Sequence, residues 1–481
     1  MRNTFVLIAF VLAGLSTHVW AKQPGNSPMR RDRYLLLDSR IIDKTIGVKL
    51  TLGKVKKHPA NPLFGQDRPW EHHYDNFYGN IIYDEELKQF RLLYLNFIDG
   101  ENSLLYAYSD DGLKWVKPNL RKVVYDGNTK NNIVMMGRHG VSVFKDLRET
   151  DPAKSFKLFA KYEADDWEDQ HIEITFSADG INFSDFIPQK QISAAADTDN
   201  NAFWAPTLNK YVAMTRQWSR CPYNDQTKAP RDGSPETDPA IDNRKGYRQV
   251  ARTESTNFLN WTRAEVVLEG LNTRFQTHCL PVFYYAGVYL GMPGIWETMG
   301  EKRVYTELAW SPDTVNWHRI NPGTSFIPNS DVKGDHDYGM VWRCVPPLFL
   351  DSDEVWLYYG GFDLKHGGDG RKGYLCLATM KKDRWAGYVT GSAAGKIETT
   401  LVKCAGKALN ICADVKDGGS IRAEVVGVDG LSLGDSIPVT ADVTDGVVTW
   451  SGNDLSALIG TQIKLRFELK NATLYSFSFS D

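Results

Sequence analysis

A short phrase, Ser-x-Asp-Gly-x-x-Trp/Phe, recurs along this chain at a spacing close to one supersecondary unit. Clean copies begin at Ser109 and Ser177, and degenerate copies begin at Thr253 and Ser311. A repeat of roughly 60 to 75 residues is one structural unit that buries its apolar face by packing against its neighbours. The phrase therefore limits the possible folds to arrays of similar units.

Each copy of the phrase follows a pair of short apolar segments that read as two antiparallel strands with a turn between them. A fifth such pair stands near the end of the array without a copy of the phrase. The first segments are 81–83, 141–144, 202–204, 281–283 and 347–349, and the second segments are 90–94, 156–159, 211–214, 288–291 and 355–359. Five repeats of about four short strands predict an all-β fold, a five-bladed β-propeller with a central pocket.

The N-terminus has the form of a secretory signal peptide. Arg2 supplies the positive charge, residues 5–15 the apolar run, and residues 19–21 a cleavage sequence that ends in Ala. The apolar run is short for a membrane span, and no longer one follows. We therefore expect 1–21 to be removed and the mature protein to be secreted or periplasmic, with no membrane attachment.

The composition changes to Gly, Ser and Ala near residues 390–396, as at a linker. Strand-like segments separated by Asp-Gly turns follow, which predicts a small β-sandwich over 391–481. Residues 22–390 are assigned to the propeller, and within them 46–52 are expected to complete the last blade. No feature indicates an oligomer, so a monomer is expected.

A net charge of -3 without a basic stripe argues against a nucleic-acid partner. The 14 Trp and 22 Tyr suit stacking on sugar rings, although propeller blades also bury such side chains between their sheets. The six cysteines lack the spacing of a metal site, and neither a metal nor another cofactor is expected. Cys404 and Cys412 are left open as a disulfide or as buried thiols.

The residues that stand just before the inner strands are expected to meet at one mouth of the propeller. These positions carry charged and aromatic side chains, whereas ordinary turns are rich in Gly, Ser and Asn. The residues predicted to bind substrate at or near this mouth are Trp70, Glu71, His72, Asn76, Arg138, His139, Asp199, Arg274, His278 and Trp296. Their convergence is typical of a polar active site.

Carboxylates also gather at this mouth. Hydrolysis of a glycosidic bond needs two of them, one as a protonated acid and the other as a nucleophile or base. The candidates are Asp75, Asp197, Glu297 and Asp337. Asp111, Asp179 and Asp313 belong to the repeated phrase and are expected to hold turns instead.

The five repeats, the phrase at 109–115, the signal peptide and the trailing β region resemble the five-bladed propeller glycosidases related to glycoside hydrolase families 32 and 43. The resemblance implies hydrolysis of plant or algal oligo- or polysaccharides. It also implies a nucleophile or base on the first inner strand, which carries over to Asp75 within 74–80. The Asn-Asp-Pro-Asn-Gly, Arg-Asp-Pro and Glu-Cys signatures of family 32 are absent, so the chain resembles a divergent, family 32-like group.

Two other functions are compatible with the same pattern. A non-catalytic carbohydrate-binding propeller would hold its sugar without a carboxylate pair, and a lyase or phosphorylase would use the cations. Arg138, His139, Arg274, His278 and Arg343 stand near the predicted carboxylates. Some of these cations are expected to neutralise the acids. A surplus would suit a uronate or sulfate group, bound by Arg138 or Arg274.

Overall fold

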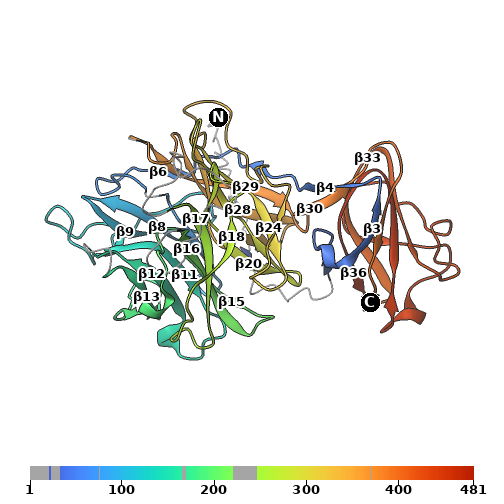
Figure 1. The fold of residues 1–481 in the computed structure, drawn as a ribbon, viewed down its shortest axis with the longest axis horizontal. Coiled ribbons are helices and arrows are strands. Elements are labelled where there is room, and N and C mark those ends of the chain that lie inside the picture. Colours follow the sequence, from blue (N-terminus) through green and yellow to red (C-terminus); the bar gives the residue numbers. More distant parts are fainter. Residues whose placement is uncertain (1–20, 23–32, 75, 165–168, 220–245, 369) are drawn as a thin grey trace, which may run out of the picture.

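The structure is a computed structural model. It describes residues 21–22, 33–74, 76–164, 169–219, 246–368 and 370–481 (Figure 1). The expected all-β fold is confirmed, because the helices described are three-residue 3₁₀ turns: η1 (Ser39–Ile41), η2 (Pro152–Lys154), η4 (Lys190–Ile192) and η6 (Ser456–Leu458). No helix within these residues has the length and apolar character that crossing a membrane requires. Asp75, Cys221 and residues 1–20 of the predicted signal peptide lie outside the described residues.

Four of the five sequence repeats each form a four-stranded antiparallel sheet, in a propeller-like arrangement. The first contains β7 (Asn80–Asp84), β8 (Gln89–Ile98), β9 (Glu101–Ser109) and β10 (Ile133–Met136). The second contains β11 (Arg138–Lys145), β12 (Phe156–Tyr162), β13 (His171–Ser177) and β14 (Ile187–Pro188). The third contains β15 (Asn201–Ala205), β16 (Lys210–Trp218), β17 (Arg248–Ser255) and β18 (Glu265–Glu269). The fourth contains β20 (Val282–Tyr285), β21 (Val288–Gly291), β24 (Leu308–Ser311) and β25 (His318–Ile320).

Polar side chains join the first strand of each of these sheets to the first strand of the next. In each case a buried side-chain oxygen accepts a hydrogen bond from a backbone N–H of the following sheet. The pairs are Asn80 Oδ1 with Val143 N at 3.0 Å, Ser142 Oγ with Ala202 N at 3.0 Å, and Asn201 Oδ1 with Val282 N at 2.8 Å. The four first strands therefore lie side by side, and polar side chains satisfy backbone groups that their own sheets leave unpaired.

The repeated phrase forms a local turn, as expected from the sequence. Ser109 Oγ accepts from Gly112 N at 2.9 Å, and Asp111 Oδ1 accepts from the backbone N–H groups of Leu113 and Lys114. Gly112 has a φ of +74°, where a side chain would meet Trp356 at 2.5 Å. Asp179 and Asp313 make the same backbone bonds in their copies, so these three carboxylates hold turns.

The fifth repeat belongs to a larger sheet of ten strands. Its strands are β27 (Leu348–Leu350), β28 (Glu354–Phe362) and β29 (Gly373–Lys381), extended by β26 (Met340–Arg343), β23 (Val304–Thr306), β22 (Gly294–Glu297), β19 (Phe275–Cys279) and β1 (Ala21–Lys22). The last two, β5 (Lys56–Lys57) and β6 (Phe64–Gly65), pair with β29. Tyr358 of β28 donates to Gly112 O at 2.7 Å. The fifth repeat therefore contacts the turn of the first.

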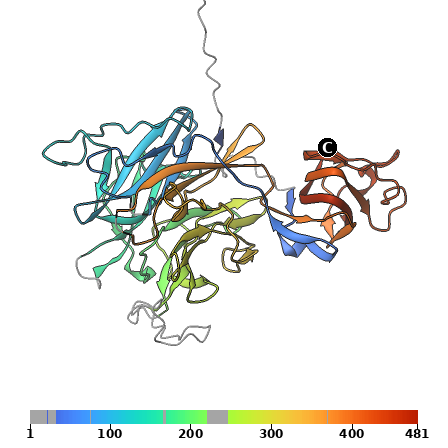
Figure 2. The same cartoon turned by 90° about the horizontal axis from the view of Figure 1, so that it is seen from above.

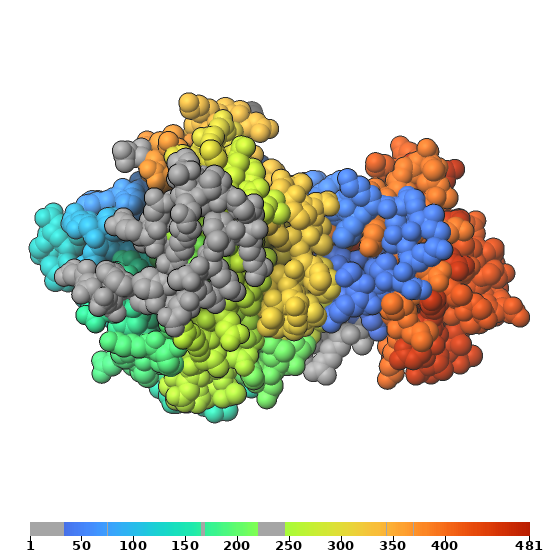
Figure 3. Space-filling model, viewed as in Figure 1, coloured from blue at the N-terminus to red at the C-terminus, as the bar shows by residue number. Residues whose placement is uncertain are grey.

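The C-terminal strands form an eight-stranded sheet that also takes in the start of the chain. It contains β2 (Arg33–Leu35), β3 (Ile42–Ile46), β4 (Lys49–Leu52), β30 (Ala386–Val389), β31 (Gly395–Thr399), β33 (Ala408–Val425), β34 (Val443–Val448) and β36 (Leu465–Ser480). A two-stranded sheet of β32 (Val402–Lys403) and β35 (Gln462–Ile463) accompanies it. Figures 2 and 3 show the blue N-terminal strands beside the orange and red C-terminal strands.

This pairing corrects the expectation for residues 46–52. They pair with β30 and β31 of the C-terminal sheet, and β5 and β6 take the place predicted for them beside β29. The predicted boundary at 390 also separates residues that the structure pairs, because β30 bonds to β36. Sequence pattern identifies a strand but not its partner, and the N-terminal strands β3 to β6 are more than 300 residues from their partners in the chain.

The five described cysteines are buried free thiols, which excludes the disulfide left open between Cys404 and Cys412. Cys404 Sγ donates to Gly406 O at 3.3 Å, and Cys412 Sγ donates to Lys382 O at 3.6 Å. Burial raises the pKa of both thiols, so they stay protonated at neutral pH.

Candidate active site

Asp197 lies at the centre of a cluster of charged groups just before β15. Its Oδ2 is 3.5 Å from Arg216 NH1, and its Oδ1 is 3.9 Å from His139 Nδ1. Arg216 is buried in β16 and His139 is buried in β11, whereas the Asp197 side chain is 43% exposed. Both side chains therefore approach from the protein interior and leave one side of the carboxylate open.

Arg216 also joins this carboxylate to the next repeat. Its NH2 is 2.8 Å from His278 Nδ1 and donates to His278 O at 2.6 Å. Thr198 Oγ1 donates to the same carbonyl at 2.5 Å. Asp197, Arg216 and His278 therefore form one connected group across the third and fourth repeats.

Aromatic rings extend the cluster toward the first and fifth repeats. The His278 ring lies 4.5 Å from Trp342 and 5.0 Å from His366. Trp342 is 5.8 Å from Tyr78, and Tyr78 is 5.8 Å from His139. These ring contacts therefore join His278 to His139 through Trp342 and Tyr78.

Two further tryptophans border the same region. The guanidinium of Arg248 lies 4.8 Å from the Trp218 ring and 4.1 Å from the Trp296 ring, and Trp296 is 5.4 Å from His366. Trp218 is the last residue of β16, and Trp296 is in β22. Indole rings beside a charged group are a common arrangement at sites that bind polar ligands with apolar faces.

The cluster keeps Asp197 ionised. Partial burial alone would raise the pKa of Asp197, but Arg216, His139, Lys161 and Arg248 outweigh it and lower that pKa well below its usual value. Burial, followed by the charge of Arg216, lowers the pKa of His278, so this imidazole is neutral at pH 7. Asp197 can therefore accept a proton or attack an electrophile, but it cannot donate a proton near neutral pH.

The backbone next to position 75 is unusual. Asn76, Phe77 and Tyr78 have φ values of +54°, +65° and +37°, a run of three non-glycine residues in the left-handed region. Asn76 Nδ2 donates to Tyr78 OH at 3.0 Å, and Phe77 is fully buried. Backbone strain of this kind persists only where packing enforces it, and it is concentrated at functional sites.

The structure brings together part of the predicted substrate-binding set. His139, His278 and Trp296 lie in the cluster with Asp197, and Asn76 contacts it through Tyr78. Asp199 is buried near Cys279. Burial is the main cause of the raised pKa of the Cys279 thiol, and the negative charge of Asp199 raises this pKa further. These residues come from the repeats whose inner strands begin at the mouth.

The remaining residues predicted around the first inner strand make other contacts. Trp70 Nε1 donates to Asn132 Oδ1 at 2.7 Å, and His72 Nε2 is 3.1 Å from Tyr125 OH. Glu71 is buried, accepts from Tyr94 OH at 2.9 Å and pairs with Lys117 Nζ at 2.8 Å. The Glu71 carboxylate therefore organises the loop that leads to the mouth.

Two predicted catalytic carboxylates and two predicted anion-binding arginines are held in ion pairs. Arg138 pairs with Glu173 at 2.8 Å, and Arg274 pairs with Glu297 at 2.5 Å. Asp337 is fully buried, 2.6 Å from Lys57 Nζ and 2.7 Å from Tyr359 OH. The structure therefore gives Glu297 and Asp337 local charge partners and places neither in the cluster around Asp197.

Five residues of the cluster were missed by the sequence analysis: Arg216, Trp218, Arg248, Trp342 and His366. Arg216 and Arg248 are on the second and third strands of their sheet, and His366 is in the loop between β28 and β29. Most of the predicted site residues stand just before the inner strands, whereas these five lie elsewhere in their repeats. The usable signal was Arg216 itself, a charged residue that follows the apolar segment 211–214 in β16.

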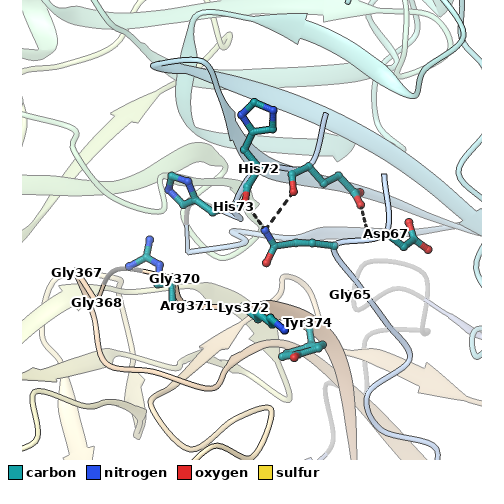
Figure 4. A pocket seen from close by; sticks show the side chains of 12 residues that line it. Gly65, Asp67, His72, His73, Gly367, Gly368, Gly370, Arg371, Lys372 and Tyr374 are labelled. Atoms are coloured by element: carbon teal, nitrogen blue, oxygen red, sulfur yellow. Dashed lines mark hydrogen bonds between the residues drawn. The ribbon is translucent and has the colours of Figure 1, made fainter. Parts of the chain in front are cut away.

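A pocket of about 900 Å³ opens between the first and fifth repeats (Figure 4). One wall is the segment before position 75, with Gln66, His72 and His73, and the other is the β28–β29 loop, with Arg371 and Lys372. A second pocket, about 530 Å³, is lined by the opposite ends of the inner strands and is largely apolar. No group of three or more His, Cys, Asp or Glu within the described ranges is arranged to hold a metal ion.

No protein-family model matches the chain, and no curated protein matches it. Solved structures resemble it at low identity. An N-acetylgalactosamine deacetylase from F. plautii, in complex with blood group B trisaccharide, has a TM-score of 0.46 and 11% identity over 69% of this chain and 96% of that one. A β-1,2-mannobiose phosphorylase from Listeria innocua has a TM-score of 0.44 and 13% identity over 68% and 97%. A fructofuranosidase from Schwanniomyces occidentalis has a TM-score of 0.38 and 11% identity over 86% and 97%. Because these identities and TM-scores are low, the function of this chain is argued from the chemistry of its own site.

Proposed function

We propose that the protein is a glycoside hydrolase whose reaction takes place at the mouth lined by Asp197, His139 and His278. The observation that carries this proposal is Asp197, a partly exposed carboxylate kept ionised by Arg216 and His139 and bordered by aromatic rings. A sugar ring offers hydroxyl groups to charged side chains and an apolar face to tryptophans. A carboxylate in such a setting suits attack on, or water activation at, an anomeric carbon.

The division of roles follows from protonation. Asp197 acts as nucleophile or base because its proton is lost far below neutral pH. The acid that protonates the leaving oxygen has to be a second carboxyl group. The sequence predicts Asp75 as nucleophile or base, and because Asp197 takes that role in this proposal, Asp75 is proposed as the acid instead. The strained run 76–78 supports this pairing, since it holds the backbone that follows position 75 in a fixed geometry.

The proposal includes the architecture. We take β27–β29 with β5 and β6 as a fifth blade, because Tyr358 of β28 bonds to the turn of the first repeat. The C-terminal sheet would then fold over its own apolar core as a sandwich. An oligosaccharide or polysaccharide is the proposed partner, and the protein would act as a secreted or periplasmic monomer.

The substitution Asp197→Asn tests the function. We expect turnover to fall by about a hundredfold or more, because the amide keeps the shape of the carboxylate but neither attacks nor accepts a proton. Release of reducing sugar from arabinosyl, fructosyl, xylosyl and galactosyl substrates measures it, with Asp75→Asn assayed beside it. Sugar binding without hydrolysis by the unsubstituted protein would instead establish a carbohydrate-binding propeller.

A second candidate is phosphorolysis. It is favoured by the basic side chains around Asp197, because Arg216, His139, Lys161 and Arg248 all lower the pKa of this carboxyl group. In that case a phosphate ion would attack the sugar, and cleavage would require added phosphate. The same panel, run with and without inorganic phosphate and analysed for sugar phosphates, separates the two reactions.

A further inference from the structure

The pocket of about 530 Å³ at the opposite ends of the inner strands shares no lining residue, among those described, with the cluster around Asp197. Its buried floor carries Asn80, Ser142 and Asn201, whose side-chain oxygens accept from the backbone of the following sheet. Val345 also lines it, and its carbonyl accepts from a backbone N–H of β7 at 2.7 Å. The floor is therefore part of the hydrogen-bonded ring that joins the repeats, which gives the pocket a fixed shape.

The polar side chains of this floor already serve the backbone. Asn80 Nδ2 donates to Val141 O at 2.8 Å, and its Oδ1 accepts from Val143 N at 3.0 Å. Ser142 and Asn201 each accept from a backbone N–H in the same way. A sugar carries several hydroxyl groups, which would lose their hydrogen bonds to water here with few replacements. The floor therefore favours a ligand whose buried part is apolar.

Aromatic side chains form the walls above this floor. Phe144, Phe203, Trp204 and Tyr284 line the pocket, and each is half-buried, so part of each ring remains open. Aromatic rings pair with one another by offset stacking or edge-to-face contact, which adds to the gain from burying their area. These walls therefore suit a ligand that has an aromatic ring of its own.

The rim of the pocket carries a cation, Arg148, that makes no ion pair with any residue the structure describes. Its side chain is exposed, and its Cζ lies 3.3 Å from the centre of the Trp204 ring. The other charges of the lining are paired, because Lys145 is 3.6 Å from Asp84, and a lysine of β12 is 3.1 Å from the buried Asp146. Stacking on an indole leaves the edge of a guanidinium, with its N–H donors, open to a carboxylate.

We propose that this pocket binds an aromatic monocarboxylate, with its ring against Phe203 and Trp204 and its carboxylate on Arg148. The walls and the floor select the apolar ring, and the guanidinium on the rim supplies charge-assisted hydrogen bonds to the carboxylate. The pocket shares no described residue with the Asp197 cluster. The inference therefore does not depend on the function proposed for Asp197.

The test compares three probes on the full-length protein by titration calorimetry: naphthoate, its neutral amide naphthamide, and its saturated counterpart decahydronaphthoate. We expect naphthoate to bind about fivefold to tenfold more tightly than naphthamide, as a partly solvated charge contact would give, and added salt to weaken this preference. Arg148→Gln should abolish the preference. Decahydronaphthoate keeps the charge but lacks the aromatic ring, so it should bind more weakly than naphthoate.

Arg121→Gln is the matched control, because Arg121 is also exposed but does not line the pocket. It should leave the affinities for all three probes unchanged. The inference is overturned if naphthoate does not bind, if Arg148→Gln and Arg121→Gln act alike, or if the saturated acid binds as tightly as naphthoate.

A further variant separates this test from that of the proposed function. Asp197→Asn should leave naphthoate binding unchanged, because Asp197 does not line the pocket. A loss of binding in that variant would place the ligand at the other mouth and overturn the inference. Naphthoate binding that depends on Arg148 supports the pocket even in a protein without hydrolase activity.

Discussion

Arg216 sets the protonation of the group on which the proposed chemistry depends. Its guanidinium is the nearest of the cations that lower the pKa of Asp197. Arg216→Met should therefore raise that pKa. Because Asp197 acts only when ionised, activity should then be lost at a higher pH as the solution is acidified. The acid limb of the kcat/KM profile measures the shift.

Two variants show whether the shift comes from charge at this position. Arg216→Lys keeps a cation and should shift the acid limb less than Arg216→Met does. Arg274→Met removes an arginine that pairs with Glu297 at 2.5 Å outside the cluster, and should leave the limb in place. Equal shifts in all three variants would show that Arg216 has no specific part in controlling Asp197.

At the scale of elements, strands β5 and β6 connect the beginning of the array to β29 at its end, and a partly buried ion pair holds β5 in place. Lys57 of β5 lies 2.6 Å from Asp337, which also accepts from Tyr359 OH at 2.7 Å. Asp337→Asn should lower the free energy of unfolding by about 1 to 3 kcal/mol, since Lys57 is partly solvated, and change kcat/KM little. Urea unfolding and steady-state kinetics check this.

A double-mutant cycle with Lys57→Met isolates the pair. The cost of the two changes together should be smaller than the sum of the single costs, because each single change already breaks the same contact. If Asp337→Asn instead lowered kcat strongly and left the free energy of unfolding unchanged, Asp337 would have the catalytic role predicted from the sequence.

At the scale of the whole molecule, the C-terminal sheet and the repeats share a core. Trp385 is fully buried and lies 5.3 Å from Phe283 and 6.4 Å from Phe349. Arg33 of β2 pairs with Asp383 at 3.1 Å and donates to Ser476 Oγ at 2.9 Å. A chain ended at residue 390 would lose β36, the partner of β2 and β30.

We therefore expect the 22–390 fragment to be insoluble or unfolded, and the full chain to unfold in a single transition. Trp385→Ala should destabilise the full chain by about 3 to 5 kcal/mol, as a large cavity in a shared core does. Circular dichroism during heating, with near-ultraviolet signals for the tryptophans, measures both. A stable, folded 22–390 fragment would show that the repeats do not depend on the C-terminal sheet.

The sequence alone was enough to predict strand pairs, their turns and the all-β class. These features depend on contacts within a few residues, such as the bonds of Asp111 to Leu113 and Lys114, so local pattern encodes them. The same reasoning selected His139, Asp197 and His278, and the structure joins these three residues in one cluster through Arg216.

Only the tertiary structure decided which distant strands pair and which charges meet. Residues 49–52 alternate like any half-buried strand, and nothing local distinguishes β30 from β29 as their partner. Arg138 and Arg274 resembled ligand-binding cations until Glu173 and Glu297 were found beside them. Arg216, on a second strand, reaches the site instead. The alternation of residues along a strand specifies the face of the sheet on which each side chain lies. The neighbours of that side chain depend on how sheets pack, and these sheets are made from residues far apart in the chain.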